Sequence, residues 1–384
     1  MRILMLAPQP FYEGRGTPIA VRAAAEGLAQ LGHAVDLLTY FGGEDVALPP
    51  GVTHTRCPRP GIVKQVPIGV SWQKLPCDWV LYRHAAAMLE ARRYDLIHGV
   101  EEAGFLARRL ARRFTVPYVF DMDSLMSSQI IEKNPLFAPV AWVFGWLERR
   151  AIRDSAGVLA VCPMLVDYAR RHHPAGRVAL LPDQPVPPSG DAQAPPELLQ
   201  LTGVKLVYVG NLERYQGIDL LLDAFALVAG ELPQATVVII GGREDHIAHY
   251  RAKAGALAAS GRVIFLGPRP LAQLPAILRE ADVLLSPRSK GINTPMKIYN
   301  YMDAGKAILA TRMTTHTQVL DDATACLVDP TPAAFAEGLR RVASEPQYRA
   351  RIAAAAKARL DAEYSIPRWH QRLADFITSL PTVS

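Results

Sequence analysis

Residues 281–311 read ADVLLSPRSKGINTPMKIYNYMDAGKAILAT, and this stretch indicates the fold class. Residues 281–286 and 307–311 are short apolar runs of the kind that form buried strands. Between them, a polar loop leads into a helix, with Thr294 placed as an N-cap, Pro295 as the first helical residue and Gly305 just past the end. The stretch therefore predicts a strand–loop–helix–strand unit of a parallel α/β sheet.

The predicted helix begins with a cation, which is unusual. Lys297 lies in the first turn, where the helix dipole makes a positive charge unfavourable by about 0.3–1 kcal/mol. Arg288 and Lys290 precede it in the same loop. Basic side chains around the free N–H groups of a helix start are suited to a phosphate. We favour a site for an anionic ligand over the alternative, a solvated lysine beside an ordinary crossover loop.

The composition is that of a globular protein with two domains. The chain has 384 residues, of which 50% are hydrophobic and 20% charged. Its four cysteines have no CxxC spacing, which argues against a disulfide framework or a zinc site. Apolar runs are too short for a signal peptide or a membrane span, so we expect a cytoplasmic protein. The net charge of +6 suits nucleotide phosphates or acidic lipid headgroups and is too small to indicate nucleic acid.

One architecture occurs twice along the chain, on either side of a proline-rich run. Residues 2–39 predict a strand, a glycine-containing loop, a helix that closes at Gly32 and a second strand. The pattern restarts at 205–210 with KLVYVG, a loop and a helix from Ile218. We therefore expect two Rossmann-like domains that face each other across a cleft. Their predicted ranges are 1–182 and 204–362, with a linker at 183–203 and a terminal helix at 363–384.

Polar side chains of the first domain follow predicted strands. His98, Glu101, Asp121 and Asp123 lie at strand ends, where ligands of parallel sheets gather. Glu101 is the preferred candidate for a proton acceptor by its position, and a solvated carboxylate is the alternative. His98 is either a second candidate or a buried structural imidazole.

Residues 136–147 are strongly apolar and are followed by Glu148, Arg149 and Arg150. The stretch includes Trp142 and Trp146 and is too short to span a membrane. We expect a helix buried in the core, and the alternative is a helix that lies on a membrane surface.

Three stretches carry a resemblance to a known family. They are GRGTPIAVRAAAEGLAQLGHAVDLLT at 14–39, VYVGNLERYQGIDLLLDAF at 207–225 and NTPMKIYNYMDAGKAILAT at 293–311. In this order they resemble a GT-B glycosyltransferase of family four, and the resemblance covers nearly the whole chain. It implies a retaining enzyme with a nucleotide-sugar donor on the second domain, an acceptor on the first and catalysis in the cleft. It also implies that no metal is required and that the terminal helix crosses back onto the first domain.

The chain departs from the family pattern at functional positions. The glutamates of the Glu-x7-Glu motif fall near Ile292 and on Asn300, and the usual catalytic histidine after His98 is Val100. The family's diphosphate-binding Arg and Lys fall on Asn211 and Gln216. Because charge-assisted hydrogen bonds contribute about 1.5–3 kcal/mol each, such losses need replacements. The candidate replacements are Arg214, Lys297 and Arg15.

The residues expected to form the site follow from these patterns. Arg214 and Lys297 would neutralise the departing diphosphate, and Glu101 and His98 would handle the acceptor proton. Asn300 would contact the ribose or the sugar, with a packed helix residue as its alternative. The sequence Asp121-Met122-Asp123 resembles the metal-binding DxD of the other major glycosyltransferase fold, but we expect acceptor binding or a loop role here. The predicted donor-binding residues are Gly14, Arg15, Gly16, Thr17, Asn211, Arg214, Gln216, Arg269, Asn293, Thr294, Pro295, Lys297 and Asn300.

The expected function is transfer of a hexose-type sugar from a nucleotide diphosphate sugar to a glycan or lipid-linked acceptor in cell-surface polysaccharide or glycolipid synthesis. An anionic inner membrane leaflet is the expected peripheral partner. The departures leave two alternatives open: a noncatalytic GT-B protein that binds nucleotide or a partner transferase, and a sugar-nucleotide epimerase. Lys and Arg form no single stripe, which argues against a nucleic-acid binder.

Overall fold

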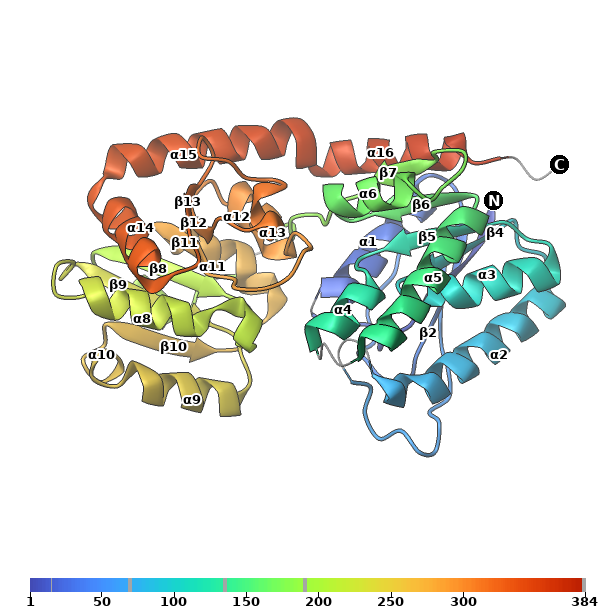
Figure 1. Cartoon of the computed structure of the whole chain (residues 1–384), viewed down its shortest axis with the longest axis horizontal. Coiled ribbons are helices and arrows are strands. Elements are labelled where there is room, and N and C mark those ends of the chain that lie inside the picture. The colour runs from blue at the N-terminus through green and yellow to red at the C-terminus, as the bar shows by residue number, and fades with distance from the viewer. Residues whose placement is uncertain (15, 68–70, 134–136, 189–191, 382–384) are drawn as a thin grey trace. The chain divides into compact units, whose positions relative to one another are not determined.

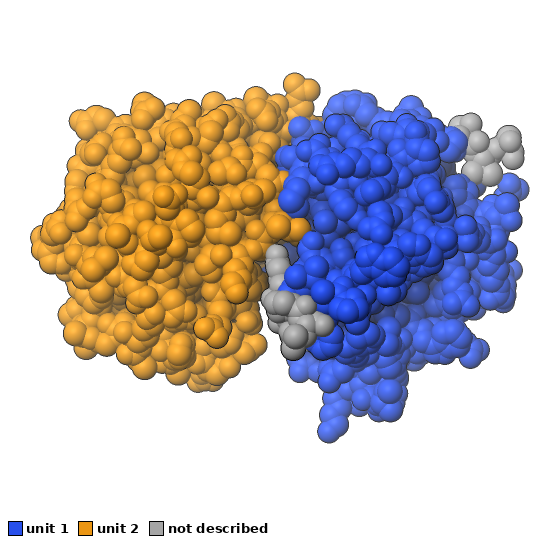
Figure 2. All heavy atoms as spheres, in the orientation of Figure 1, with its two compact units in different colours: residues 1–183, 369–384 blue, residues 184–368 orange. Residues whose placement is uncertain are grey.

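The chain forms two compact units, each built around one parallel sheet. The computed structural model describes every residue except 15, 68–70, 134–136, 189–191 and 382–384. Unit 1 comprises residues 1–183 and 369–384, and unit 2 comprises residues 184–368 (Figures 1 and 2). Each sheet has helices on its faces, as predicted for an α/β protein.

Unit 1 contains a seven-stranded parallel sheet in the order β3-β2-β1-β4-β5-β6-β7. The order reverses between β1 and β4, and ligands of open α/β sheets bind at such a point. The strands are β1 (Arg2–Ala7), β2 (Ala34–Thr39), β3 (Val52–Arg56), β4 (Leu96–Val100), β5 (Tyr118–Met122), β6 (Gly157–Ala160) and β7 (Val178–Leu180).

The helices of unit 1 include the last helix of the chain. They are α1 (Gly16–Gln30), α2 (Leu75–Ala91, after the 3₁₀ turn Trp72–Lys74), α3 (Ala103–Phe114), α4 (Met126–Lys133), α5 (Ala138–Asp154), α6 (Pro163–Arg170) and α16 (Ile366–Ser379). From Trp369 onward, α16 belongs to unit 1, where Trp369 and Leu373 are buried in its core. A β-carbon on Gly27 of α1 would lie 2.8 Å from Trp369, so this glycine allows α16 to pack closely.

Unit 2 contains a six-stranded parallel sheet in the order β10-β9-β8-β11-β12-β13. Its strands are β8 (Val204–Val209), β9 (Ala235–Ile240), β10 (Val263–Gly267), β11 (Val283–Ser286), β12 (Ala307–Thr311) and β13 (Cys326–Val328). Its helices are α7 (Pro196–Leu199), α8 (Ile218–Val228), α9 (Glu244–Ala254), α10 (Ala256–Ala259), α11 (Leu274–Glu280), α12 (Met296–Asp303), α13 (Thr314–Thr317), α14 (Pro332–Ser344) and α15 (Pro346–Arg359). A π-helical turn at Leu360–Tyr364 joins α15 to α16, and 3₁₀ turns occur at Arg214–Gln216 and Leu271–Gln273.

Several local predictions differ from the structure. Strand β3 and the first six residues of α2 lie within residues 43–80, a segment rich in proline and glycine that has no sustained apolar period and is therefore expected to be irregular. Helix α12 begins at Met296 with Pro295 as its N-cap, so Thr294 is not the capping residue. Residues 184–203, predicted as a linker, belong to unit 2 and contain α7.

Helix α5 corrects the prediction that residues 136–147 are buried in the core. Trp142 is 69% exposed and Trp146 is 39% exposed. The buried side of this helix is lined by Ala141, Gly145, Glu148, Ala151 and Ile152. The prediction of a buried helix was wrong because it relied on the tryptophans. Small residues and one hydrogen-bonded carboxylate occupy the inner face instead.

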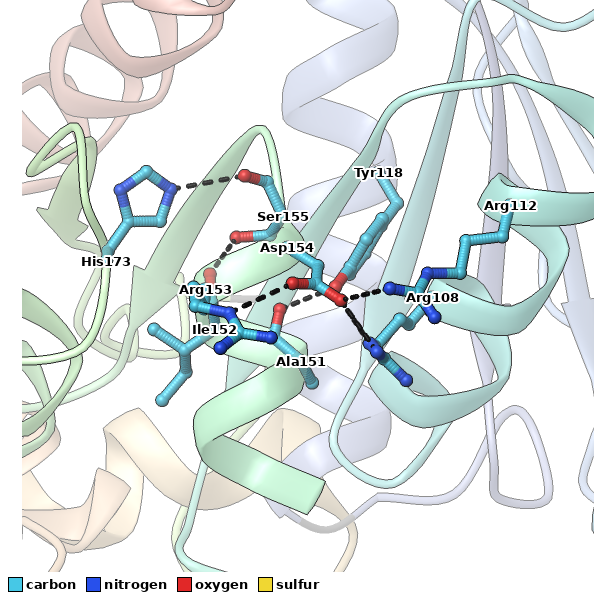
Figure 3. A network of polar contacts seen from close by, with 9 residues as sticks. All are labelled: Arg108, Arg112, Tyr118, Ala151, Ile152, Arg153, Asp154, Ser155 and His173. Atoms are coloured by element: carbon cyan, nitrogen blue, oxygen red, sulfur yellow. Dashed lines mark hydrogen bonds and ion pairs between the residues drawn. The ribbon is translucent and has the colours of Figure 1, made fainter. Parts of the chain in front are cut away.

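A polar network holds the end of α5 against its neighbours (Figure 3). The Asp154 carboxylate accepts hydrogen bonds from Arg108 at 2.7 Å and from Arg112 at 3.1 Å, both on α3. The Tyr118 hydroxyl of β5 donates to the Ala151 carbonyl at 2.5 Å. These bonds satisfy buried polar groups and fix α5 on unit 1.

Candidate functional site

The first cluster lies in unit 2, at the carboxyl ends of β8 and β11. Lys297 is half-buried, and its Nζ lies 3.1 Å from Oε1 of Gln216 and 4.1 Å from the centroid of the Tyr208 ring. Burial, and secondarily the nearby charge of Arg288, holds the pKa of Lys297 well below its usual range. Among the described residues, no carboxylate is ion-paired with Lys297. An anion bound beside this amine would favour its charged form.

Glycines make room for the lysine and the loops around it. A β-carbon on Gly210 would lie 2.8 Å from Nζ of Lys297 and 2.9 Å from the Tyr208 hydroxyl. A β-carbon on Gly217 would lie 1.9 Å from the Pro287 carbonyl oxygen, and the φ of Gly217 is +76°. The loop after β8 therefore approaches the loop after β11 more closely than any residue with a side chain permits.

The loop after β11 is held by internal hydrogen bonds. Arg288 donates to the carbonyls of Lys290 at 2.8 Å and Asn293 at 3.3 Å, and its guanidinium lies 5.2 Å from the Tyr215 ring centroid. Thr294 is 3% exposed, and its hydroxyl has no hydrogen-bond partner among the described residues. A buried hydroxyl beside a helix start and a buried cation is suited to an anionic ligand.

Asn300 is a packed residue of α12 with a structural role, which is the alternative given for it above. Its Oδ1 accepts a hydrogen bond from the backbone N–H of Val186 at 2.7 Å, and its Nδ2 donates to the Met296 carbonyl at 3.1 Å. The residue is 6% exposed. Both polar ends of the side chain are thus used within unit 2.

The remaining predicted donor residues of unit 2 are dispersed. Arg214 and Asn211 are exposed, and Asn211 Oδ1 accepts from the Glu213 N–H at 3.3 Å. Arg269 is ion-paired with Glu197 of α7 at 3.3 Å. Of the two predicted phosphate cations, Lys297 lies in the buried cluster, whereas Arg214 lies on the surface.

The second cluster lies in unit 1, at the carboxyl ends of β4 and β5. His98 is fully buried, and its Nε2 lies 2.8 Å from Oδ2 of Asp121. Glu101 follows β4 with a φ of +47°, a left-handed conformation that is unfavourable for a residue with a side chain. Its N–H donates to the Asp121 carbonyl at 2.9 Å, which holds this turn in place. The Thr17 hydroxyl of α1 donates to the Glu101 carboxylate at 3.4 Å.

Carboxylates surround this turn. Burial raises the pKa of Asp123 well above its usual range, and the nearby charges of Glu101 and Asp121 raise it further. Burial, with Asp121, raises the pKa of Asp183 to about 7. Acidic groups with raised pKa values in one place can accept or donate protons near neutral pH.

The remaining predicted site residues of unit 1 lie in the loop before α1 and at its start. Gly16 begins α1 with open space around its α-carbon, and Gly14 precedes it. Arg15 lies outside the described residues. In the described part of the chain, no group of three or more His, Cys, Asp or Glu side chains is arranged to hold a metal ion.

Sequence reasoning missed two members of these clusters. Tyr208 lies within the apolar run of β8, where nothing marks it as a platform for a lysine. Asp183 follows β7 inside the proline-rich run, and its position after a strand was the available signal.

Comparison with known proteins places both units in glycosyltransferase families. Residues 15–184 match the family described as Glycosyl transferase 4-like domain. Residues 191–359 match the family described as Glycosyl transferases group 1. The two matches together cover most of the chain, one in each unit.

Individual relatives have the same assignment at modest identity. The D-inositol 3-phosphate glycosyltransferase of Corynebacterium urealyticum is 26% identical over 96% of this chain and 91% of its own. The phosphatidyl-myo-inositol mannosyltransferase of Mycobacterium tuberculosis is 32% identical, but only over 41% of this chain and 42% of its own.

Solved structures show the same fold. The sucrose-phosphate synthase of Thermosynechococcus elongatus superposes with a TM-score of 0.79 at 20% identity, over 98% of both chains. The Anabaena protein HepE in complex with UDP superposes with a TM-score of 0.74 at 18% identity, over 99% of this chain and 100% of its own. The two parallel sheets, the two family matches and these relatives show that the chain belongs to the GT-B glycosyltransferases of the family-four type.

Proposed function

We propose that this glycosyltransferase moves a hexose-type sugar from a nucleotide diphosphate sugar to a glycan or lipid-linked acceptor, with retention of configuration and without a metal cofactor. The proposed setting is cell-surface polysaccharide or glycolipid synthesis at the cytoplasmic face of the inner membrane. Unit 2 would bind the donor and unit 1 the acceptor.

The observation that carries the proposal is the half-buried Lys297 without a carboxylate partner among the described residues. A buried cation is unfavourable unless an anion accompanies it, and a diphosphate supplies that anion. The unsatisfied hydroxyl of Thr294 and the N–H groups at the start of α12 provide further donors. The lowered pKa of Lys297 is a consequence of the ligand-free site, and phosphate binding would restore the charged form.

The names of related proteins support the choice of substrates. HepE has been solved with UDP and with UDP-glucose, which supports a nucleotide-sugar donor. The relatives named for D-inositol 3-phosphate and phosphatidyl-myo-inositol support a polyhydroxylated acceptor, in one case lipid-linked.

The chemistry assigned to each unit follows from its charges. As the sugar–phosphate bond breaks, negative charge develops on the departing diphosphate, and Lys297 would stabilise it. The acceptor hydroxyl must lose a proton in the same step. Glu101 is the group proposed to orient the hydroxyl and receive this proton, and Thr17 and the turn held by Asp121 fix its position.

The experiment is a thermal-shift panel of UDP, GDP, ADP and their common sugar derivatives on the full chain. A nucleotide at about 100 times its dissociation constant should stabilise the protein by about 2.7 kcal/mol. Lys297→Ala should abolish the shift, whereas Lys306→Ala, a matched change after the same helix, should retain it. No shift with any nucleotide would contradict the proposal and favour a noncatalytic protein. The selected donor is then incubated with and without lipid extract, because conversion without an acceptor would indicate an epimerase.

A further inference from the structure

Tryptophan is unusually exposed in unit 1. Of the five tryptophans in the chain, four are exposed, by 64% at Trp72, 57% at Trp79, 69% at Trp142 and 39% at Trp146. Trp369 is the buried one. Tryptophan is normally well buried, and exposed apolar groups that cluster mark an interaction surface.

The exposed side chains form two stripes on helices. Trp72, Leu75 and Trp79 recur at a spacing of three and four residues where α2 begins, so they share one face. Trp142, Val143 and Trp146 do the same on α5. We call these six residues the aromatic rim.

Both stripes lie at the same edge of the sheet. Helices that connect parallel strands run antiparallel to them, so each helix begins at the edge where the strands end. The aromatic rim spans the 3₁₀ turn before α2, the beginning of α2, and the part of α5 up to Trp146. Figure 1 shows the beginnings of both helices at the lower side of unit 1. This is the edge that carries Glu101 and Asp123.

Trp142 and Trp146 stay at the surface of α5 because hydrogen bonds hold the opposite face of the helix against unit 1. The buried carboxylate of Glu148 accepts from the Ser127 N–H at 3.0 Å and the Ser127 hydroxyl at 2.6 Å. The end of the helix is held through Asp154 (Figure 3). The helix cannot rotate to bury Trp142 and Trp146 without breaking both attachments.

The exposed charged residues of the described segment that leads to Trp72 are cations. Arg59 and Lys64 are exposed, whereas Lys74 is buried and ion-paired with Glu102. Asp78 of α2 is partly buried and accepts a hydrogen bond from the Tyr40 hydroxyl, and residues 134–147 contain no charged residue. On α5, the guanidinium of Arg150 lies 3.9 Å from the Trp146 ring centroid. A second copy of the chain would bring like charges together. An anionic surface with an apolar interior complements both the charges and the rings.

We propose that the aromatic rim is the surface by which this protein docks on an anionic lipid bilayer, with the tryptophan rings at the headgroup level. This inference rests on the proposed function, because it places the carboxyl edge that would receive the acceptor next to the lipid. A lipid-linked acceptor would then reach Glu101 without leaving the bilayer.

The test measures partitioning of the full chain onto vesicles of equal parts phosphatidylglycerol and phosphatidylcholine. Binding should shift the tryptophan emission to shorter wavelength and fall with salt. The double substitutions Trp72→Ser with Trp79→Ser, and Trp142→Ser with Trp146→Ser, should each weaken partitioning by about 10- to 100-fold. Leu227→Ser, which changes a 60% exposed residue of unit 2, should leave it unchanged.

The outcomes separate the docking surface from the proposed reaction. Absence of vesicle binding, or binding that both double variants retain, would overturn the docking proposal. A dimer in solution that the same substitutions dissociate, without vesicle binding, would assign the surface to a second copy instead. All variants are also assayed for the nucleotide-induced thermal shift. Vesicle binding without any nucleotide response would overturn the proposed function and leave the docking surface standing.

Discussion

The Nζ of Lys297 lies 3.1 Å from Oε1 of Gln216, a neutral acceptor where a carboxylate would normally accompany a buried cation. This pairing leaves the positive charge uncompensated, and burial therefore lowers the pKa of Lys297 well below its usual range. The proposed diphosphate would supply the compensating charge. The site is also sensitive to pH, because only the protonated amine attracts a phosphate.

The first prediction concerns pH and nucleotide binding. In the wild type, the nucleotide-induced rise in Tm should shrink as pH increases through the lowered pKa of Lys297, because the neutral form loses its attraction for phosphate. Lys297→Arg keeps its charge throughout this range and should show a flat pH profile. A wild-type profile as flat as that of the arginine variant would contradict this role.

The second prediction tests the space around the lysine. Gly210→Ala places a methyl group 2.8 Å from Nζ of Lys297 at a φ of +153°. It should destabilise the protein by about 1–3 kcal/mol and abolish the nucleotide-induced shift. Gly230→Ala is the matched control, since a methyl group added there would have nothing within 4 Å and the φ of Gly230 is ordinary. Retention of full nucleotide binding in Gly210→Ala would show that the ligand does not depend on this position of Lys297.

The third prediction concerns acid stability. Burial lowers the pKa of His316 to about 4, and the ring lies 2.8 Å from the Ser286 hydroxyl and 2.7 Å from the Thr311 carbonyl. The unfolded histidine takes up a proton near pH 6.5 and the folded one only near pH 4. Stability should therefore be full above about pH 6.5 and fall by up to about 3 kcal/mol as pH decreases to about 4.

The measurement is Tm against pH for the wild type and His316→Gln. The variant should be less stable at about pH 7, because it disturbs the bonds to Ser286 and Thr311, but its Tm should fall less between about pH 6.5 and 4. His54 of unit 1, with a pKa also lowered to about 4, adds a fall of the same sign in both proteins. Parallel curves for the two proteins would rule out His316 as a source of the acid sensitivity.

The fourth prediction separates structure from ligand binding at Asn300. Asn300→Ala leaves the Val186 N–H without its acceptor and should cost about 1–3 kcal/mol of stability. Asn300→Asp retains an acceptor for Val186 and should recover part of that loss. Both variants should keep a nucleotide-induced shift of wild-type size at a temperature well below Tm. A selective loss of that shift in Asn300→Asp would contradict this prediction and indicate that Asn300 contacts the donor.

The sequence predicted the fold better than the site for a physical reason. Strands such as β12 and the ends of α1 and α12 follow from apolar runs and from glycines such as Gly32 and Gly305, which are local properties. The role of Asn300 depends on Val186, 114 positions away, and the platform under Lys297 depends on Tyr208. Such partners are determined by tertiary packing and leave no periodic signal. The tryptophans of α5 misled the prediction because apolar character alone does not say whether a side chain faces the core or a partner.

The last prediction concerns Glu101, which has a φ of +47°; the other described non-glycine residue with a positive φ is Thr115, at +55°. Replacing either by glycine relieves the left-handed backbone, by about 1 kcal/mol, so neither Glu101→Gly nor Thr115→Gly should lower Tm.

The activities of these two variants should differ. Once a donor and an acceptor are in hand, Glu101→Gly and Glu101→Gln should both reduce sugar transfer by about 10²- to 10⁴-fold, as expected for loss of a proton acceptor. Thr115→Gly, at the opposite end of α3, should leave transfer unchanged. The nucleotide-induced shift should persist in all three variants, because Glu101 belongs to unit 1. If Glu101→Gln transferred sugar at the wild-type rate, the strained turn would serve the position of Asp121 or Asp123 instead, and one of those carboxylates would become the candidate for the acceptor proton.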